Sequence, residues 1–435
     1  MYRFSGYICA LFLFCVCSIL VFMTLITFPN LRVETTDGDR FKRTDLRKVI
    51  RDKVPVSFHR NRSFSDDQIR KMSVLGKWLY IQGEGSPVPR KRDKKRSYLI
   101  VIWKHGQFLE RRHIKRFTQN KSVSLIYISH LNCNVINCKL SYRERDIVEA
   151  DAVLFHLHLV ESVFDLPLRE NFDQRWIFLT DESPIHTFIR GNQELSDYNG
   201  IFNWSMSYRS DSDIPVPYGR TVLKPHDRKA DFPGNSTINT YKTKLVAIMG
   251  SNCASKNNRW SYVKKLKEVL GADLDIYGKC LGGNITACPG HFTKDCSALK
   301  PYKFYLAFEN SNCREYLTEK VFWHAYEKWT IPIIMGAPKA DCERLLPPRS
   351  FLHVSDFVNP SALANYLQYL NRYQYEYLQF HEWRKYYSIV NEHGYFGSAS
   401  QHYCRICEAL HYNSPQTKVY NDLNSFWNKS KDCDS

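Results

Sequence analysis

Residues 304–336 read FYLAFENSNCREYLTEKVFWHAYEKWTIPIIMG, with apolar residues at both ends and polar ones gathered between them. The first apolar run predicts a strand, the middle a helix and the last run a second strand, which is the order of a parallel strand–helix–strand unit. Glu309 and Asn310 directly follow the first strand, and Glu319 and Lys320 open the helix. Ligands of open α/β sheets bind beyond the carboxyl ends of strands, and a helix N-terminus favours anions. We therefore expect a site for an anionic ligand here, while an exposed Glu319–Lys320 pair on a helix surface remains the alternative.

The same alternation continues on both sides of this stretch. Short apolar runs are typical of parallel strands that are buried on both faces. Such runs predict strands at residues 98–103, 124–128, 152–159, 176–179, 244–250, 274–277, 303–308 and 331–335. Helices are expected at 260–270, from the apolar residues on one face, and at 318–328.

These elements predict an α/β fold with two Rossmann-like, doubly wound domains facing a cleft. About 340 residues are too many for one ordinary core. A proline-rich, charged segment without periodicity at residues 215–233 is the expected junction between the two domains. The sequence has no glycine-rich phosphate loop, which argues against a nucleoside triphosphatase or a dehydrogenase.

The N-terminal region contains an uncharged run at residues 7–28, YICALFLFCVCSILVFMTLITF. Its length suits a helix that crosses a membrane, which needs about 20 apolar residues. We predict a cytoplasmic tail at 1–6, a transmembrane signal anchor at 7–28 and a poorly ordered stem at 29–97 that ends in the basic run RKRDKKR. The larger part of the chain would then lie on the lumenal side of the membrane.

Cysteines and glycosylation sequons support a lumenal location. Eleven of the 14 cysteines follow the predicted anchor, which suits an oxidising compartment, and their odd number leaves at least one thiol outside an intrachain disulfide. Cys404 and Cys407 form a single CxxC, which is weak evidence for a redox or zinc site and favours structural disulfides. The net charge of +17 would suggest that the chain binds nucleic acid, but a chain in the lumen is not exposed to nucleic acid. N-x-S/T sequons begin at Asn61, Asn120, Asn203, Asn235, Asn284 and Asn428.

Several segments together resemble the lumenal α-1,3-fucosyltransferases, glycosyltransferase family 10. They are FENSNCREYLTEK (308–320), IPIIMG (331–336), LTDESP (179–184), SYRSDSDIPVPYG (207–219) and SFLHVSDFVNPSALANYL (350–367). The cysteine-containing segment at 277–296 looks more like invertebrate members of the family. The resemblance implies a GT-B architecture with an acceptor-side domain at 98–240, a GDP-fucose-binding domain at 241–397 and a disulfide-tied tail at 398–435.

The family pattern also implies roles for individual residues. Glu182 is expected to be the catalytic base, with the neighbouring Asp181 as the competing candidate. Cys404 and Cys407 are expected to pair with Cys133 and Cys138, whereas no pairing can be transferred to the other cysteines. The expected donor-binding residues are Tyr208, Ser251, Asn252, Arg259, Tyr305, Glu309, Asn310, Glu319 and Lys320.

The implied reaction is an inverting transfer of L-fucose from GDP-fucose to N-acetylglucosamine of glycoprotein glycans. It needs one base and cations for the departing diphosphate, but no second carboxylate as acid. No metal or other cofactor is expected to be required, and whether Mn²⁺ stimulates the enzyme is left open. The alternatives are a protein O-fucosyltransferase of the same fold and a non-catalytic lumenal glycan-binding relative.

Two other motifs suggest metal ligands. Asp211 and Asp213 form a DxD tripeptide, which binds manganese in glycosyltransferases of another fold, but we favour a structural turn. His156 and His158 share one face of a strand, and their apolar surroundings favour core histidines. The expected location is the Golgi membrane in type II orientation, with the endoplasmic reticulum as the alternative. The sequence does not indicate the oligomeric state or which acceptor glycan is used.

Overall fold

The computed structural model describes residues 64–82, 96–104, 113, 125–127, 133–135, 137–188, 193–224, 240–288, 295–398 and 400–434. All of them belong to one compact unit, Val56–Ser435. Within these ranges, no helix is both long and apolar enough to span a membrane. The predicted tail at 1–6, the anchor at 7–28, the stem up to residue 63 and the sequons at Asn61, Asn120 and Asn235 lie outside the described residues.

The first half of the described chain forms a seven-stranded sheet with the order β2-β3-β1-β4-β5-β6-β7. All neighbouring strands are parallel except β2 and β3, which are antiparallel at one edge. The central strand β4 is buried at all five positions, which agrees with helices or loops on both faces. In chain order the strands are β1 (Tyr98–Ile102), β2 (Leu125–Tyr127), β3 (Cys138–Ser141), β4 (Ala152–His156), β5 (Arg175–Thr180), β6 (Trp204–Ser207) and β7 (Ile214–Pro215).

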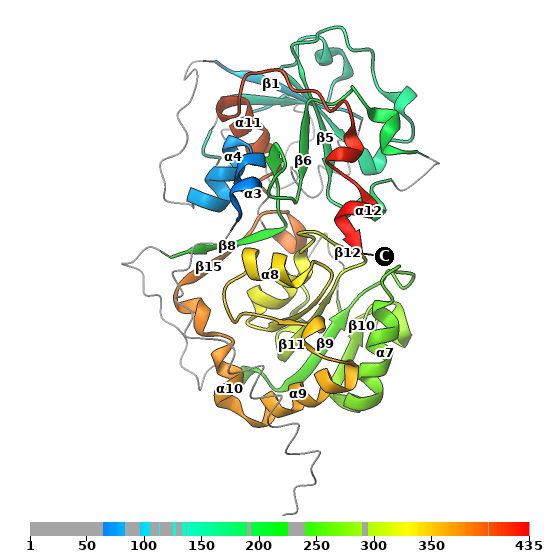
Figure 1. The fold of residues 1–435 in the computed structure, drawn as a ribbon, viewed down its shortest axis with the longest axis vertical. Coiled ribbons are helices and arrows are strands. Elements are labelled where there is room, and N and C mark those ends of the chain that lie inside the picture. Colours follow the sequence, from blue (N-terminus) through cyan, green and yellow to red (C-terminus); the bar gives the residue numbers. More distant parts are fainter. Residues whose placement is uncertain are drawn as a thin grey trace, which may run out of the picture. The chain divides into compact units, whose positions relative to one another are not determined.

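The second half forms a five-stranded, fully parallel sheet with the order β10-β9-β11-β13-β14 (Figure 1). The opening stretch of the sequence supplies β11 and β13, with Phe304 opposite Ile331 and Phe308 opposite Met335. The α/β fold with mainly parallel sheets is therefore confirmed. The strands are β9 (Lys244–Met249), β10 (Leu274–Tyr277), β11 (Tyr302–Phe308), β13 (Ile331–Met335) and β14 (Leu352–His353).

Helices α7 (Arg259–Leu270) and α9 (Pro360–Arg372) pack against each other beside this sheet. Trp260, Val263, Leu266 and Leu270 of α7 are buried and recur at helical spacing, so one face of the helix packs inward. α9 begins at Asn359, whose side chain accepts a hydrogen bond from the Ala362 N–H. Two short helices, α8 (Lys339–Leu345) and α10 (Gln374–Gln379), complete this part of the fold.

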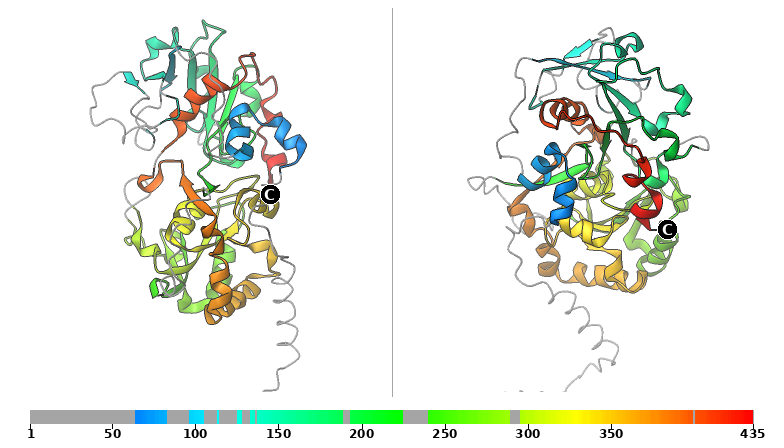
Figure 2. Two further views of the ribbon diagram at one scale, coloured as in Figure 1. Left: turned by 90° about the vertical axis from the view of Figure 1, so that its left-hand side faces the viewer. Right: turned by 45° about the horizontal axis from the view of Figure 1, so that its top comes forward.

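The C-terminal segment returns from the five-stranded sheet to the seven-stranded one (Figure 2). Its helix α11 (His402–Tyr412) is buried along its whole length. Disulfides join Cys404 to Cys133 and Cys407 to Cys138, the pairing that the resemblance implied. The chain then ends in the short helix α12 (Lys429–Asp432) and strand β16 (Cys433–Asp434), which pairs with β12 (Asn312–Cys313).

The predicted stem is wrong over residues 64–82. This segment forms α3 (Asp66–Lys71), α4 (Val74–Lys77) and a helical turn at Trp78–Gln82, and α4 lies beside α11 (Figure 1). Leu75 is fully buried, and its N–H donates to Asn413 Oδ1 over 3.2 Å. The segment is therefore part of the core of the seven-stranded half, and its short helices give too little periodicity to be recognised in the sequence.

The segment at 215–233, where we expect the junction between the two domains, contains a strand. Strand β8 (Gly219–Leu223) pairs antiparallel with β15 (Tyr387–Asn391), which comes after the second sheet. Beside this pair, the buried carboxylate of Glu392 accepts hydrogen bonds from Arg220 and Arg405. Three distant parts of the chain are thus connected at this point. The rest of the segment, residues 225–233, lies outside the described residues.

Candidate functional site

A cavity of about 520 Å³ is lined by residues of both sheets. The five-stranded sheet contributes residues that follow β9, β10 and β11, including Ser251, Lys279 and Asn310. The seven-stranded sheet contributes Glu182, which follows β5, and Tyr218 lies just before β8. The cavity therefore lies at the carboxyl ends of parallel strands, where open α/β sheets bind their ligands.

The loops after β9 and β10 approach each other closely at the cavity wall. Gly278 has φ +92°, and a Cβ atom there would lie 2.3 Å from the carbonyl oxygen of Gly250. Only glycine fits this position without strain. The disulfide Cys253–Cys280 joins the same two loops, so this part of the wall is covalently fixed.

Lys320 is the centre of a charged cluster at the cavity. Its Nζ lies 2.9 Å from Glu309 Oε2, 3.1 Å from Glu319 Oε1 and 2.9 Å from Thr318 Oγ1. Burial opposes the charge on the ammonium, but Glu309 and Glu319 outweigh it and raise the pKa of Lys320, which therefore stays charged. Burial also acts on Glu319, and the charge of Lys320 overcomes it and lowers the pKa of Glu319 to about 2.

Glu309 is not exposed to the cavity. It is fully buried, and it accepts hydrogen bonds from the Thr318 N–H and hydroxyl besides pairing with Lys320. Burial raises its pKa. Gly336 has φ +152°, and a Cβ atom there would come within 2.7 Å of the Glu309 side chain, so glycine leaves room for this carboxylate. Glu309 therefore fixes the position of Lys320 and of the start of the following helical segment, from the side that faces away from the cavity.

That segment is helical, as expected for 318–328, but its turns are not those of an α-helix. Residues Lys320–Ala325 form wide, π-type turns, and Tyr326–Lys328 a tight 3₁₀ turn that ends at Trp329 with φ +58°. Wide turns of this kind occur often at functional sites. His324 of this segment lines the cavity, and burial lowers its pKa to about 3, so its imidazole is neutral.

Arg259 supplies a second cation. It begins α7, and its guanidinium donates to the carbonyl oxygens of Phe308 over 2.8 Å and Asn252 over 2.7 Å. Burial lowers its pKa, although an arginine remains charged at neutral pH. Its Nε is buried and has no hydrogen-bond partner among the described residues.

Glu182 lies on the opposite side, at the end of β5. Its Oε2 accepts hydrogen bonds from Asn310 Nδ2 over 3.1 Å and from the Tyr316 hydroxyl over 3.0 Å. The hydroxyl of Ser311 also donates to Ser183 over 2.6 Å. The carboxylate is thus positioned by the loop that follows β11 of the other sheet, and one of its oxygens accepts no hydrogen bond from the described residues.

Asp181, the competing acid, has a different environment. It is 5% exposed and does not line the cavity. Its Oδ1 lies 3.1 Å from His393 Nε2 and 3.3 Å from His402 Nε2, and its Oδ2 lies 4.0 Å from His156 Nε2. Of the two neighbouring acids, only Glu182 faces the cavity.

The structure brings most of the predicted donor-binding residues together, but not all of them. Ser251, Asn252, Arg259, Asn310, Glu319 and Lys320 line the cavity. Tyr208 and Tyr305, like Glu309, are buried behind the lining, where Tyr208 packs on Tyr316 at 5.0 Å between ring centroids and Tyr305 on His324 at 5.4 Å.

Sequence reasoning missed the aromatic part of the wall. Tyr218, Tyr316, Tyr395 and Phe396 line the cavity, and Tyr218 stacks on Tyr395 with 5.8 Å between ring centroids. Tyr316 lies within the opening stretch and could have been singled out there. Tyr395 and Phe396 belong to a later loop that no pattern connected to the site.

The DxD tripeptide lies elsewhere and its carboxylates are already engaged. Asp211 accepts hydrogen bonds from Arg209 over 2.7 Å and Arg314 over 2.8 Å, and Asp213 from the Tyr420 hydroxyl over 2.7 Å. Neither aspartate lines the cavity. The favoured structural role of this tripeptide therefore agrees with its position.

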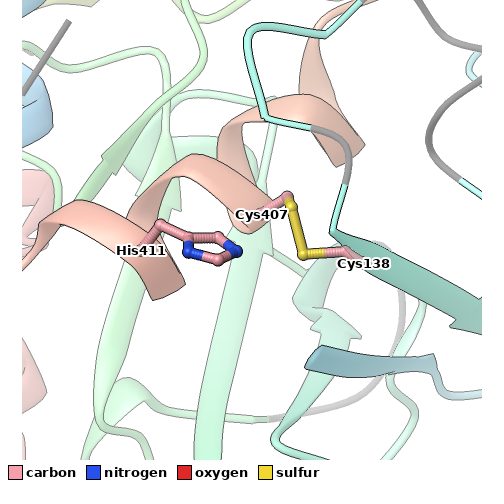
Figure 3. Close-up of side chains that lie close together, drawn as sticks. All are labelled: Cys138, Cys407 and His411. Atoms are coloured by element: carbon pink, nitrogen blue, oxygen red, sulfur yellow. A yellow bond between two sulfur atoms is a disulfide. The ribbon is translucent and has the colours of Figure 1, made fainter. Parts of the chain in front are cut away.

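The structure describes five disulfides. Besides the two at α11, these are Cys253–Cys280, Cys288–Cys296 and Cys313–Cys433, and Cys342 is a buried free thiol. His411 lies close to Cys138 and Cys407, but the two sulfurs are bonded to each other and offer no thiolate to a metal (Figure 3).

Three of the predicted sequons lie in described residues. Asn203 is fully buried; its Nδ2 donates to the Lys418 carbonyl and its Oδ1 accepts from the Trp176 N–H, so it is wrong as a glycan site of the folded chain. Asn284 is exposed at the cavity rim, and Asn428 caps α12 with its Oδ1. These two stay predictions.

Comparisons with known proteins show which family the chain is similar to. Residues 239–427 match the family model "Glycosyltransferase family 10 (fucosyltransferase) C-term", and residues 95–219 match "Fucosyltransferase, N-terminal". "Alpha-(1,3)-fucosyltransferase 7" of Mus musculus is 32% identical over 80% of this chain and 80% of its own. "Glycoprotein 3-alpha-L-fucosyltransferase A" of Drosophila melanogaster is 34% identical over 68% of this chain, but the match spans only 55% of the Drosophila protein. The solved structure "Crystal Structure of alpha1,3-Fucosyltransferase with GDP-fucose" aligns with a TM-score of 0.45 at 15% identity, covering 82% of this chain and 99% of that one.

These matches make the chain a glycosyltransferase. Within that class it belongs to glycosyltransferase family 10, the fucosyltransferase family, which confirms the resemblance seen in the sequence.

Proposed function

We propose that the chain is an inverting α-1,3-fucosyltransferase that moves L-fucose from GDP-fucose to N-acetylglucosamine of glycoprotein glycans. The observation that carries this proposal is the division of the cavity wall, with Glu182 at one sheet and the cations Lys320 and Arg259 at the other. Two mainly parallel sheets that share one cavity at their carboxyl ends support a GT-B architecture, with an acceptor-side domain at 98–240 and a donor-binding domain at 241–397.

The diphosphate of the donor would bind at Lys320 and Arg259. Lys320 keeps its charge because two carboxylates surround it, and the cation Arg259 also lines the cavity. Glu319 repels phosphate but can accept hydrogen bonds from sugar hydroxyls. Together the two cations stabilise the negative charge that develops as GDP leaves.

Glu182 would act as the base. Its carboxylate takes the proton of the acceptor hydroxyl while that oxygen forms a bond to C1 of fucose. The bond between C1 and the diphosphate oxygen breaks at the same carbon, and GDP leaves with the electron pair. Attack from the face opposite the leaving group inverts the configuration at C1. Asn310 and Tyr316 orient the carboxylate, and burial raises the pKa of Tyr316, which keeps it a hydrogen-bond donor.

The aromatic wall supports a sugar as substrate. Tyr218, Tyr395 and Phe396 line the cavity, and aromatic rings pack well against the apolar side of a pyranose ring. We further propose the Golgi lumen as the location, with residues 1–28 as tail and anchor. Five disulfides and an exposed sequon at Asn284 support an oxidising lumenal compartment.

A transfer assay with labelled GDP-fucose tests the proposal. The acceptors would be a glycan with only core N-acetylglucosamine, one with antennal N-acetyllactosamine, a Ser/Thr peptide and buffer alone. We expect transfer to a glycan acceptor and an α-linked product by NMR. Transfer to the peptide alone would favour a protein O-fucosyltransferase. If the chain neither transfers fucose nor hydrolyses the donor, a non-catalytic relative would be favoured.

A further inference from the structure

We propose that the C-terminal clamp, defined as residues 427–434, positions the base Glu182 against the loop that follows β11. The inference rests on the proposed function, because it assigns Trp427 and Cys433 as positioning residues for the same transfer reaction. The clamp contacts the segment after Glu182 at its beginning and the segment after Asn310 at its end. None of the described residues 427–434 lines the cavity, so the clamp would act on the site from outside it.

The first contact of the clamp is made by Trp427. This side chain is fully buried, and its indole N–H donates a hydrogen bond to the Thr187 hydroxyl over 2.9 Å. Thr187 directly follows the helical turn Pro184–His186, which begins two residues after Glu182. The Thr187 hydroxyl also donates to the Pro184 carbonyl over 3.1 Å. Trp427 therefore fixes the turn that follows the base.

The second contact lies at the other end of the clamp. A disulfide joins Cys433 of β16 to Cys313 of β12, and Cys313 is fully buried. The same two strands pair through their backbones, with Asn312 opposite Asp434 (Figure 1). The clamp is therefore attached to the loop after β11 both covalently and by strand pairing.

The attached loop is the one that holds the base. Asn310 lies three residues before Cys313 and Tyr316 three residues after it. Both side chains donate hydrogen bonds to Glu182 Oε2, over 3.1 and 3.0 Å. A loop that is fixed at its middle leaves these two donors little freedom, so the direction of the carboxylate depends on the clamp.

Buried ion pairs hold the clamp between its two contacts. The guanidinium of Arg209, which is 3% exposed, lies 3.0 Å from Asp432 Oδ2 and 2.7 Å from Asp211 Oδ2. Arg314 pairs with the same Asp211 over 2.8 Å, and its N–H donates to the Asp432 carbonyl over 2.6 Å. Two arginines thus face two carboxylates. Because an unpaired buried charge is costly, this arrangement favours a single position of the clamp.

The groups proposed to bind the diphosphate are held by other contacts. Lys320 is paired with Glu309 and Glu319, and the guanidinium of Arg259 donates to two backbone carbonyls. These contacts do not involve residues 427–434. Loss of the clamp should therefore disturb the base while GDP binding is retained, a result that a general loss of folding would not give.

Kinetics of the full chain with GDP-fucose and a glycan acceptor test the proposal. Thr187→Val keeps the shape of the side chain but loses the hydroxyl, and Cys313→Ser with Cys433→Ser removes the disulfide. Each should lower kcat by about tenfold or more, because small displacements of a reacting group are costly. The affinity for GDP, measured by calorimetry, should stay at the wild-type value. Thr187→Ser keeps the hydroxyl and Lys429→Ala changes an exposed residue of α12, so both should behave like the wild type.

Two results would overturn the proposal while fucose transfer by the wild type leaves the proposed function intact. One is a wild-type kcat in both Thr187→Val and the double serine variant. The other is a loss of GDP affinity as large as the loss of kcat, which would show a general structural role. If the double serine variant does not fold, the comparison of Thr187→Val with Thr187→Ser decides alone.

Hydrogen exchange measured by mass spectrometry tests the clamp without fucose transfer. A wild type that transfers no fucose would contradict the proposed function, and exchange would still show whether the clamp holds the two loops. Residues 182–187 and 309–317 should exchange faster in Thr187→Val and in the double serine variant, while β9 and α7 exchange as in the wild type. Unchanged exchange in the two loops, or faster exchange throughout the chain, would overturn the positioning role.

Discussion

The two sheets contribute unequally to the cavity. The five-stranded sheet supplies the cations Lys320, Arg259 and Lys279 and most of the wall, from segments between Met249 and His324. The seven-stranded sheet supplies a single carboxylate, Glu182, and is tied to the C-terminal segment by two disulfides. In the proposed mechanism, the five-stranded side binds the anionic leaving group and the seven-stranded side supplies the base.

This difference separates two tasks. Binding the leaving group needs positive charge, and removing the acceptor proton needs an ionised carboxylate, so the two groups must stay close without forming an ion pair. Lys320 is already paired with Glu309 and Glu319, and Glu182 is held by the uncharged Asn310 and Tyr316. Substitutions on the two sides should therefore affect different kinetic constants.

The largest effect is expected for Glu182→Gln. The amide keeps the size and hydrogen bonding of the side chain but cannot take a proton. Turnover should fall by roughly 10²–10⁴, the usual contribution of a positioned base. Initial rates with GDP-fucose and a glycan acceptor measure this, with the exposed Glu144→Gln as a control that should behave like the wild type. Near-normal turnover in Glu182→Gln would remove this residue from the mechanism.

Lys320→Ala is expected to reduce kcat/KM by roughly 10²–10³, the range seen when one group that stabilises developing negative charge is removed. The variant should be impaired in both donor binding and turnover, because the diphosphate is bound before transfer and carries more charge as it leaves. Lys339→Ala, a half-exposed lysine of the same half of the chain, is the matched control. A loss confined to the KM of the acceptor would place Lys320 outside the donor site.

Glu392 distinguishes stability from catalysis. Burial disfavours its charge, but Arg220 and Arg405 overcome this and lower its pKa from 4.5 to about 2. A carboxylate with a lowered pKa stabilises the fold above its unfolded pKa, and this stabilisation is lost as the pH falls toward the folded pKa. Glu392→Gln should reduce the free energy of unfolding by on the order of 3 kcal/mol at pH 7. In urea unfolding at several pH values, the difference from the wild type should shrink between pH 4.5 and pH 2. A difference that does not change with pH would contradict the ion pairing.

The smallest effect is expected for a chelator. If Lys320 and Arg259 neutralise the diphosphate as proposed, a brief exposure to EDTA should leave most of the transfer activity. Complete loss of activity that is restored by Mn²⁺ would favour a metal at Asp211 and Asp213 instead. Activity before and after rapid desalting measures this.

The sequence predicts the five-stranded half well for a physical reason. Strands at 303–308 and 331–335 bury every residue, so their apolar runs are uninterrupted, and the site residues between them are contiguous. How deeply each of these site residues is buried cannot be predicted. Glu309 and Asn310 are neighbouring polar residues after the same strand, and nothing in the sequence shows which of them is buried. Glu309 is turned inward because Gly336 leaves space for it.

The seven-stranded half was predicted less well because it depends on distant contacts. Tyr395 and Phe396 reach the cavity only because the chain crosses back through β15, and no local pattern encodes that crossing. The pairing of Cys313 with Cys433 likewise spans 120 residues and follows from the antiparallel contact of β12 and β16. Spacing within a sequence cannot reveal such pairs.

The binding of GDP alone tests the division between the two sheets most directly. Calorimetry with the wild type, Glu182→Gln and Lys320→Ala separates affinity for the leaving group from chemistry. We predict that Glu182→Gln binds GDP with the affinity of the wild type although it turns over slowly, whereas Lys320→Ala binds GDP at least about tenfold more weakly. A Glu182→Gln variant that loses GDP affinity, together with a Lys320→Ala variant that keeps it, would contradict the account.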